Sequence, residues 1–237
     1  VVACQRAAVT HRVHVSVQVP AGRDGTDAAG RVLGEARLLA GRLAPLGLVV
    51  RPLNLDRLGG LVRSYTDPAG LHARGLGDGD LALAAPAGRQ VGWDHVVTEG
   101  CWHRAYTVAA WPRRPVGTMW LEPLLAARVA PAVRTLAVHL APVPARVALR
   151  RAASARMGVA LDDAQRSRYG ILSGHRQARE AADVDAREAE LVAGHAEYQT
   201  AAVVLVSAAD RNELDAAGGV LGAAAAAAGI ELRVLYG

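Results

Sequence analysis

Residues 200–236 read TAAVVLVSAADRNELDAAGGVLGAAAAAAGIELRVLY, and this stretch decides the fold class. Its first seven residues, TAAVVLV, combine β-branched and small apolar side chains, a composition typical of a strand. Asp210 and Glu213 follow with the spacing of a capping box, in which two side chains accept hydrogen bonds from backbone amides at the start of a helix. The stretch therefore predicts a strand that leads directly into a helix.

The remainder of this stretch predicts that the helix is amphipathic and that a second strand follows it. One helical face carries five apolar residues, namely Leu214, Ala217, Leu221, Ala225 and Ala228. Gly229 suits the position just beyond a helix end, and residues 230–236 predict a strand. The result is a β-α-β unit whose alanine-rich helix lies close against one side of a sheet.

The N-terminal quarter of the chain predicts a similar unit. Residues 11–19, HRVHVSVQV, alternate valine with polar side chains, which indicates a strand with one apolar face. Asp27 can cap the helix that follows. The apolar stripe of this helix consists of Val32, Leu33, Ala36, Ala40 and Leu43. Residues 48–53 predict a short buried strand and residues 55–65 a second helix, so residues 1–65 are expected to form a first α/β unit.

A loop or linker is expected over residues 66–89, which are rich in Gly, Ala and Asp without a sustained period. Residues 90–237 are then expected to form a second α+β unit. Its first two strands are predicted over residues 90–98 and 102–111, and Glu99-Gly100 between them favours a hairpin turn. The chain is therefore expected to contain two folded segments with a linker between them.

The second unit continues with further elements that define the predicted fold class. Thr118 can cap a helix, and residues 134–140 predict another strand. Residues 145–194 are helical and charged in pattern, and we expect them to form a helical arm. The predicted fold is therefore α+β, with two ferredoxin-like βαβ units and a protruding charged helical hairpin.

The charges of residues 145–194 are divided into two blocks. The first block carries eight arginines: Arg146, Arg150, Arg151, Arg156, Arg166, Arg168, Arg176 and Arg179. Carboxylates dominate residues 180–197, so two antiparallel helices would partly neutralise each other, although each exposed pair contributes only about 0.2–1 kcal/mol. The surplus positive charge is expected at the turn, where we predict that Arg166 and Arg168 bind an acidic partner surface or anionic lipid headgroups.

The composition bounds the class of protein. Of the 237 residues, 51% are hydrophobic, which is enough for the core of one large domain or two small ones. All 27 basic residues are arginine, and phenylalanine is absent; together with the scarcity of isoleucine and asparagine, this indicates a GC-rich, actinobacterial genome. The formal net charge of +5 permits acidic partners without requiring nucleic acid.

Cysteine usage and apolar runs indicate the compartment. Cys4 and Cys101 are too few for a disulfide network, which favours a reducing cytoplasm. No run of about 18 apolar residues is present, so no membrane span is expected within this sequence. The first residue is Val1 and not Met, which leads us to expect a removed upstream segment that could have carried an anchor.

Several enzyme classes lack their signatures in this sequence. Because the chain has no lysine, it has neither a P-loop nor a lysine that could form a Schiff base with a substrate or pyridoxal phosphate. The G-x-S-x-G and H-E-x-x-H motifs of hydrolases and zinc proteases are also absent. We therefore expect no catalytic or cofactor-binding residue, no ATP binding and no enzymatic activity.

Two groups of residues are candidate metal ligands. Cys101 and His103 with His95 across the predicted hairpin are the best candidate set, but no fourth ligand has the spacing that zinc requires, so a half-buried hairpin is favoured and no metal is expected. His195 follows a helix that carries Glu188. Its position after Gly194 suits the negative end of a helix dipole, so a structural role is favoured there as well.

The C-terminal motifs resemble those of a family of actinobacterial membrane proteins. The motifs are REAELVAGHAEY at residues 187–198, D-x-x-E-L at 210–214 and GIELRVLYG at 229–237, preceded by WDH at 93–95, WPR at 111–113 and L-x-x-L-L-A at 121–126. Their order resembles EccE, a membrane subunit of type VII secretion, and the non-ATPase N-terminal domain of type IV secretion and conjugation ATPases (TraC, TrbE and CagE). The likeness covers residues 90–237, and residues 1–65 only by layout.

This resemblance implies a non-catalytic structural or assembly subunit of a bacterial secretion or conjugation apparatus. It implies a cytoplasmic domain on the inner side of the cell membrane, with no catalytic residues to transfer. The implied partners are other subunits of a membrane transport complex, including a separate ATPase, with an anionic membrane surface as a further partner.

Two other functions remain open from the residues themselves. A single-stranded nucleic-acid-binding α+β module would present exposed rings beside basic residues. Trp93, Trp102, Tyr106 and Trp111 cluster near the predicted hairpin, where core packing explains them equally well, so nucleic acid is not the favoured partner. Two exposed rings on one face would favour that alternative, whereas a deep pocket with buried charge would favour a small-molecule enzyme.

Overall fold

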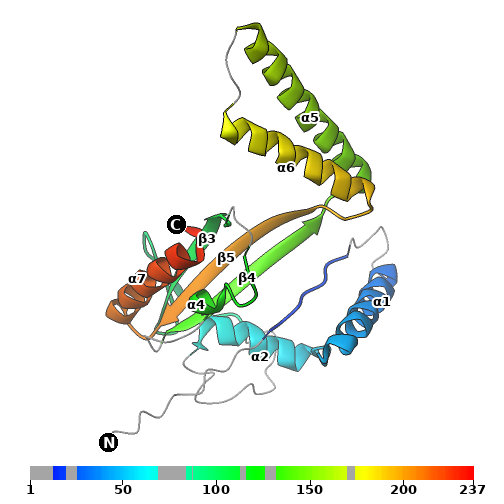
Figure 1. Ribbon diagram of the computed structural model, residues 1–237. Helices are drawn as coiled ribbons and strands as arrows, with labels where there is room; N and C mark the ends of the chain where they lie inside the picture. The colour runs from blue at the N-terminus through cyan, green and yellow to red at the C-terminus, as the bar shows by residue number, and fades with distance from the viewer. Residues whose placement is uncertain are drawn as a thin grey trace, which may run out of the picture. The chain divides into compact units, whose positions relative to one another are not determined.

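The computed structural model describes residues 13–19, 26–68, 84–86, 88–112, 116–125, 132–169 and 174–237 (Figure 1). Its elements are α1 (Thr26–Leu43), the 3-10 helix η1 (Ala44–Leu46), α2 (Leu55–Thr66), β1 (Arg89–Val91), β2 (Val96–Thr98), β3 (Cys101–Ala110), α4 (Glu122–Leu125), β4 (Val133–Pro142), α5 (Ala145–Arg168), α6 (His175–Val192), β5 (Tyr198–Ala208), α7 (Arg211–Ala228) and β6 (Glu231–Val234). The predicted α+β class is confirmed.

The chain divides into two compact units. The first unit consists of residues 1–135 together with 205–237, and the second consists of residues 136–204. These bounds differ from the segments expected from the sequence, because residues 1–65 share a unit with the hairpin and the C-terminal helix. Most of the linker predicted over residues 66–89 lies outside the described residues.

The predictions for the N-terminal segment are half right. The helices α1 and α2 lie where the apolar stripes predicted them, and the side chain of Asn54 caps α2 by accepting a hydrogen bond from the amide of Arg57. Both predicted strands are wrong: residues 13–19 and 48–53 are in no strand, and their large apolar side chains are mostly exposed. A strand needs a neighbour for its backbone groups, and alternation alone does not supply one.

All strands of the described residues belong to one six-stranded sheet, so two ferredoxin-like units are not confirmed. The strand order is β1-β2-β3-β5-β4, and β6 pairs with β3 as well. β2 and β6 share one edge of β3: β2 pairs antiparallel with its first three residues and β6 with Tyr106 through Ala110. β4 and β5 run side by side in opposite directions (Figure 1).

The hairpin between β2 and β3 forms where the sequence predicted it. Glu99 and Gly100 have φ angles of 51° and 83°, as the two central residues of a type I′ turn require. The strand predicted over residues 90–98 is divided in two, because the chain turns at Gly92–His95 and β1 pairs back on β2. This extra turn carries Trp93 and Asp94.

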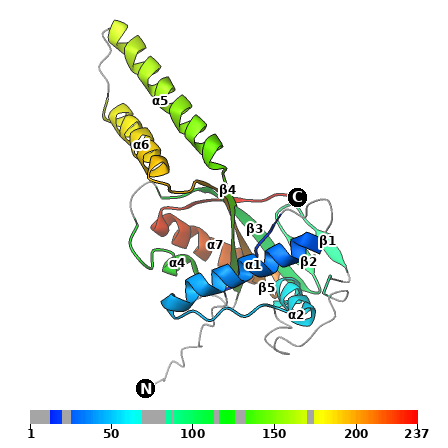
Figure 2. The ribbon, with the colours of Figure 1, turned by 90° about the vertical axis from the view of Figure 1, so that its right-hand side faces the viewer.

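α7 covers one face of the sheet as its sequence predicted. Its buried residues are Leu214, Ala217, Leu221, Ala225 and Ala228. Asp210 caps the helix by accepting from the amide of Glu213, and Gly229 ends it in the left-handed conformation. Figure 2 shows α2 on the other side of the sheet from α7. The capped amphipathic helix thus gives the sheet its buried face.

The approach of α7 to β3 predicts opposite effects for two neighbouring glycines. A Cβ at Gly218 would lie 2.6 Å from Oη of the buried Tyr106, whereas a Cβ at Gly219 would meet no atom within 4 Å. Gly219→Ala should stabilise the protein by about 0.5–1 kcal/mol through helix propensity. Gly218→Ala should lose that gain to overpacking, which typically costs about 1–3 kcal/mol. Urea unfolding measures both, and equal stabilisation by the two variants would contradict the close contact.

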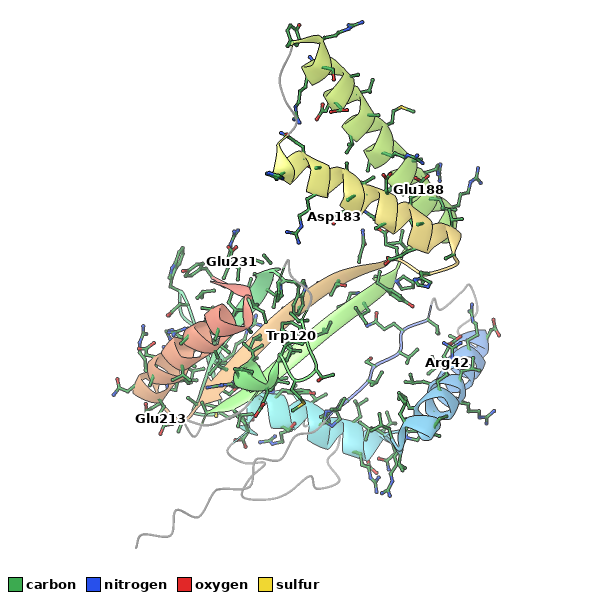
Figure 3. All side chains as sticks on the ribbon, viewed as in Figure 1. Arg42, Trp120, Asp183, Glu188, Glu213 and Glu231 are labelled. Carbon is green, nitrogen blue, oxygen red and sulfur yellow. The ribbon has the colours of Figure 1, made fainter. Side chains whose placement is uncertain are left out.

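The second unit contains the predicted charged helices. α5 and α6 contact each other, and Arg156 of α5 pairs with Asp185 and Glu188 of α6 at 3.7 and 2.8 Å. Figure 3 shows Glu188 on the side of α6 that faces α5 and Asp183 on the other side. Protrusion of this arm stays a prediction. No helix among the described residues is long and apolar enough to cross a membrane.

Candidate functional site

The strongest cluster of polar and aromatic side chains in the first unit surrounds the turn between β1 and β2. The amide of Gly92 donates to the carbonyl of His95 at 2.8 Å, which closes the turn. The ring of His95 stacks on Trp102 with centroids 4.7 Å apart, and its Nδ1 donates to Asp94 at 2.8 Å. The turn is therefore held in place by backbone, ring and charge contacts.

A buried arginine links this turn to α7. Only 9% of the Arg104 side chain is exposed, and its Nη2 donates to Asp94 at 2.5 Å and to Asp215 at 2.8 Å. The hydrogen bond from His95 is the largest cause that lowers the pKa of Asp94, and the charges of Arg104 and Arg211 act in the same direction against partial burial. Asp94 is therefore ionised at neutral pH.

Two exposed rings lie beside this ion network. Trp93 exposes 73% and Tyr236 exposes 60% of their surface, and their centroids are 5.3 Å apart with planes inclined by 34°. The amide of Gly237 donates to the carbonyl of Trp93 at 3.1 Å, and the amide of Leu235 donates to the carbonyl of Ala105 at 2.9 Å. The backbone on both sides of Tyr236 is thus tied to neighbouring segments, which fixes the position of the ring pair.

The ring pair and the ion network line one hollow. Its volume is about 530 Å³, and its lining includes Trp93, Tyr236, Asp94, Arg104 and Arg211. Arg211 approaches Asp94 and Asp215 at 3.8 and 3.7 Å, which is longer than a hydrogen bond. The hollow therefore combines aromatic faces with an exposed guanidinium, and its size falls within the range of about 300–1,000 Å³ of small-molecule sites.

A second hollow of about 430 Å³ lies on the α2 side of the same turn and has mostly apolar walls. Its polar wall contains a buried chain of hydrogen bonds. Oγ1 of Thr98 donates to the carbonyl of Thr66 at 2.7 Å, so it accepts from Nε2 of His103, also at 2.7 Å. Nδ1 of His103 then accepts from Ser207 at 2.8 Å. Thr98 thus places a proton on Nε2, and burial, which lowers the pKa of His103, favours the neutral imidazole in which Nδ1 is the acceptor.

The buried His103 predicts that acid weakens the first unit. Burial lowers the pKa of His103, and the carbonyl of Thr66 acts in the other direction to a smaller extent. The unfolded chain therefore takes up this proton first, so stability is full above about pH 6.5 and falls as the pH drops through and below that value. We expect a lower urea midpoint at pH 5.5 than at pH 7.5 by tryptophan fluorescence.

His103→Gln provides the control, because it removes the titrating group and should reduce this pH dependence while lowering stability at both pH values. A pH dependence that is the same in wild type and variant would contradict the assignment.

The residues that were candidate metal ligands have other neighbours in the structure. His103 is bound by Thr98 and Ser207, His95 by Asp94, and Cys101 is buried opposite Thr98 in the register of the hairpin. Within the described ranges, no three side chains of His, Cys, Asp and Glu are grouped so that they could hold a metal ion. These residues lie at the hairpin between β2 and β3, which the sequence predicted.

His195 lies at a helix end, where the sequence placed it. Gly194 has a φ angle of 92°, and the amide of His195 donates to the carbonyl of Glu190 at 3.0 Å. The side chain of His195 is exposed, while Glu188 is paired with Arg156. This geometry supports a structural role for His195 at the end of α6.

Arg166 and Arg168 lie in the last turn of α5, the former half-buried and the latter exposed. Residues 170–173, which come next in the chain, lie outside the described residues. Their predicted contact with an acidic surface or anionic lipid stays a prediction.

The four aromatic residues that cluster near the hairpin in the sequence differ in their exposure and in their ring partners. Trp93 is exposed, Tyr106 is buried, Trp102 stacks on His95, and Trp111 meets Trp120 edge to face at 6.0 Å. Sequence reasoning missed the partner of Trp93, because Tyr236 follows it by more than 140 positions in the chain. It also missed Arg104. This arginine is the only charged residue in β3, and a single charge within an otherwise uncharged strand indicates a specific partner.

A separate feature of the first unit is an exposed apolar surface on its N-terminal helices. We call this the α1–α2 surface; its exposed members are Leu33, Leu38, Leu46, Leu48, Val49 and Leu55. Val49 alone exposes 81% of its surface. The arginines Arg37, Arg42 and Arg51 lie between these residues in the sequence and are exposed as well. Exposed apolar side chains that gather in one part of a fold are typical of protein-protein interaction sites.

Comparison with protein-family models gives no match, and comparison with curated protein sequences gives no significant match.

Proposed function

We propose that the chain is a non-catalytic assembly subunit of a secretion- or conjugation-type transport apparatus, acting on the cytoplasmic side of the cell membrane. The observation that carries the proposal is the α1–α2 surface, which binds another protein subunit. The resemblance of the C-terminal motifs to EccE-like and conjugation-type transport proteins supports the assignment to this class of machine.

The partner is defined by the chemistry of the α1–α2 surface. Its apolar residues on α1, η1 and the segment before α2 match the apolar face of a partner helix laid against them. Residues 27–57 carry five arginines against three carboxylates, a surplus of two positive charges. We therefore expect the docking segment of the partner to be amphipathic and bordered by acidic residues, which would steer association at low salt.

The proposal predicts that a transport ATPase is encoded in the same gene cluster as this chain, and co-elution with that ATPase tests it. The purified chain should form a complex on size-exclusion chromatography, and Leu46→Glu with Val49→Glu should abolish it, because two carboxylates would be placed inside the apolar contact. Val116→Glu with Met119→Glu is the matched control, since both residues are exposed in the first unit outside the α1–α2 surface. Failure of wild type to bind the ATPase or any other subunit of the cluster would refute an assembly role, as would binding to anionic vesicles alone.

The same assay extends to the charged turn. Arg166→Glu with Arg168→Glu should weaken the complex at low salt and have less effect at high salt, because Debye screening reduces an exposed charge contact. Unchanged assembly at low salt would show that these two arginines are only solvated surface.

A further inference from the structure

We propose that the hollow beside Trp93 and Tyr236 binds single-stranded nucleic acid, with a base stacked on the ring pair and Arg211 contacting the backbone phosphate. This site is separate from the α1–α2 surface and does not depend on the assembly role. The proposal rests on three observations: the exposure of the two rings, their fixed position and the charges around them.

The exposed rings provide a stacking platform. Trp93 and Tyr236 contact each other as a tilted pair, and both rings remain largely exposed to solvent. Burial of such rings against a flat ligand is favourable, and every nucleobase offers a flat π-face. The protein pairs this surface with a hollow large enough for one nucleotide.

The platform is positioned before any ligand arrives. The carbonyl of Trp93 accepts from Gly237, and the adjacent Asp94 is held by Arg104 and His95. Because backbone and ion contacts hold both ring-bearing segments, little conformational freedom remains to be lost on binding. A fixed aromatic pair is the arrangement that base stacking requires.

The charges around the rings favour a polynucleotide over a free nucleotide. Arg104 and Arg211 face Asp94 and Asp215, so two positive charges meet two negative ones. A free nucleoside triphosphate would bring several negative charges into this balanced site. A nucleotide within a chain brings one, and the exposed Arg211, whose contacts with both carboxylates are longer than hydrogen bonds, can pair with it.

Fluorescence anisotropy with fluorescein-labelled dT12 and the full chain at 50 mM salt tests the proposal. Wild type should bind saturably, and Trp93→Ala or Tyr236→Ala should weaken binding by about 5-fold to about 150-fold, the effect of losing one stacked base. Arg211→Gln should weaken binding and reduce the slope of log affinity against log salt by about 0.7. A duplex of the same length should bind more weakly, since its bases are not accessible.

Two matched controls separate this site from general attraction. Tyr169→Ala removes an exposed tyrosine at the C-cap of α5, and Arg146→Gln removes the same charge as Arg211→Gln from an exposed helical position. Both controls should bind dT12 as wild type does. Absence of saturable binding by wild type would overturn the proposal, and so would equal losses in the site variants and the controls. Neither result would affect the α1–α2 assay.

Discussion

Leu214→Ala is expected to destabilise the first unit by about 2–5 kcal/mol, the range for Leu-to-Ala changes in well-packed cores. Leu214 is fully buried on the face of α7 that covers the sheet. The substitution removes apolar contacts and leaves a cavity that neighbouring side chains fill only in part. Urea unfolding followed by tryptophan fluorescence measures the effect, because all four tryptophans belong to this unit.

Leu161→Ala makes the same chemical change at an exposed position. The side chain of Leu161 is 64% exposed on α5, so little apolar area is lost and the expected change is within about 0.5 kcal/mol. Because α5 lies in the second unit, global unfolding by circular dichroism should accompany the fluorescence measurement. Similar losses in the two variants would show that α7 does not form the core.

Arg104→Leu should have the second-largest effect. It removes the cation that joins Asp94 and Asp215, and it leaves the partly buried Asp94 without its nearest guanidinium. Breaking a fully buried pair costs about 3–5 kcal/mol, and the partial exposure of both carboxylates reduces the expected loss to about 2 kcal/mol. Thermal or urea unfolding gives the value directly.

Arg156→Leu is the matched comparison, since Arg156 also contacts two carboxylates, Asp185 and Glu188, but exposes 62% of its side chain. Its loss should cost at most about 1 kcal/mol, as water already solvates the three charges. If the two arginine variants were equally destabilised, burial would not be what makes Arg104 important.

The sequence predicted local elements well and long-range pairing poorly. α7 was predictable with its caps and buried face, because helix signals lie within a few turns of one another. The Glu99-Gly100 turn was predictable for the same reason. Residues 13–19 have the alternation of a strand and yet are in none, since strand formation depends on a neighbour that the local pattern does not name.

The candidate site was predictable only in part. Trp93-Asp94-His95 stood out as a motif and Trp93 as one of a group of rings, but nothing local indicates that Tyr236 lies beside Trp93. That contact follows from β6 pairing with β3, which brings the end of the described chain back to the first turn of the sheet. Residues 48–53 were expected to form a buried strand, but Leu48 and Val49 are exposed, because an apolar run does not show what covers it.

The way in which α5 and α6 join the sheet has a consequence for how the sequence can change over generations. β4 and β5 are neighbours in the sheet, and where they end, the amide of Val143 donates to the carbonyl of Glu197 at 2.8 Å. The chain between these two residues makes an excursion: it leaves the sheet after β4 and returns to it at β5, at one place. Insertions and deletions there should be tolerated more readily than elsewhere, because each doubling of a flexible connection costs only about 0.6 kcal/mol. Descendants of this gene could therefore differ greatly in the length of this excursion while keeping the same strands.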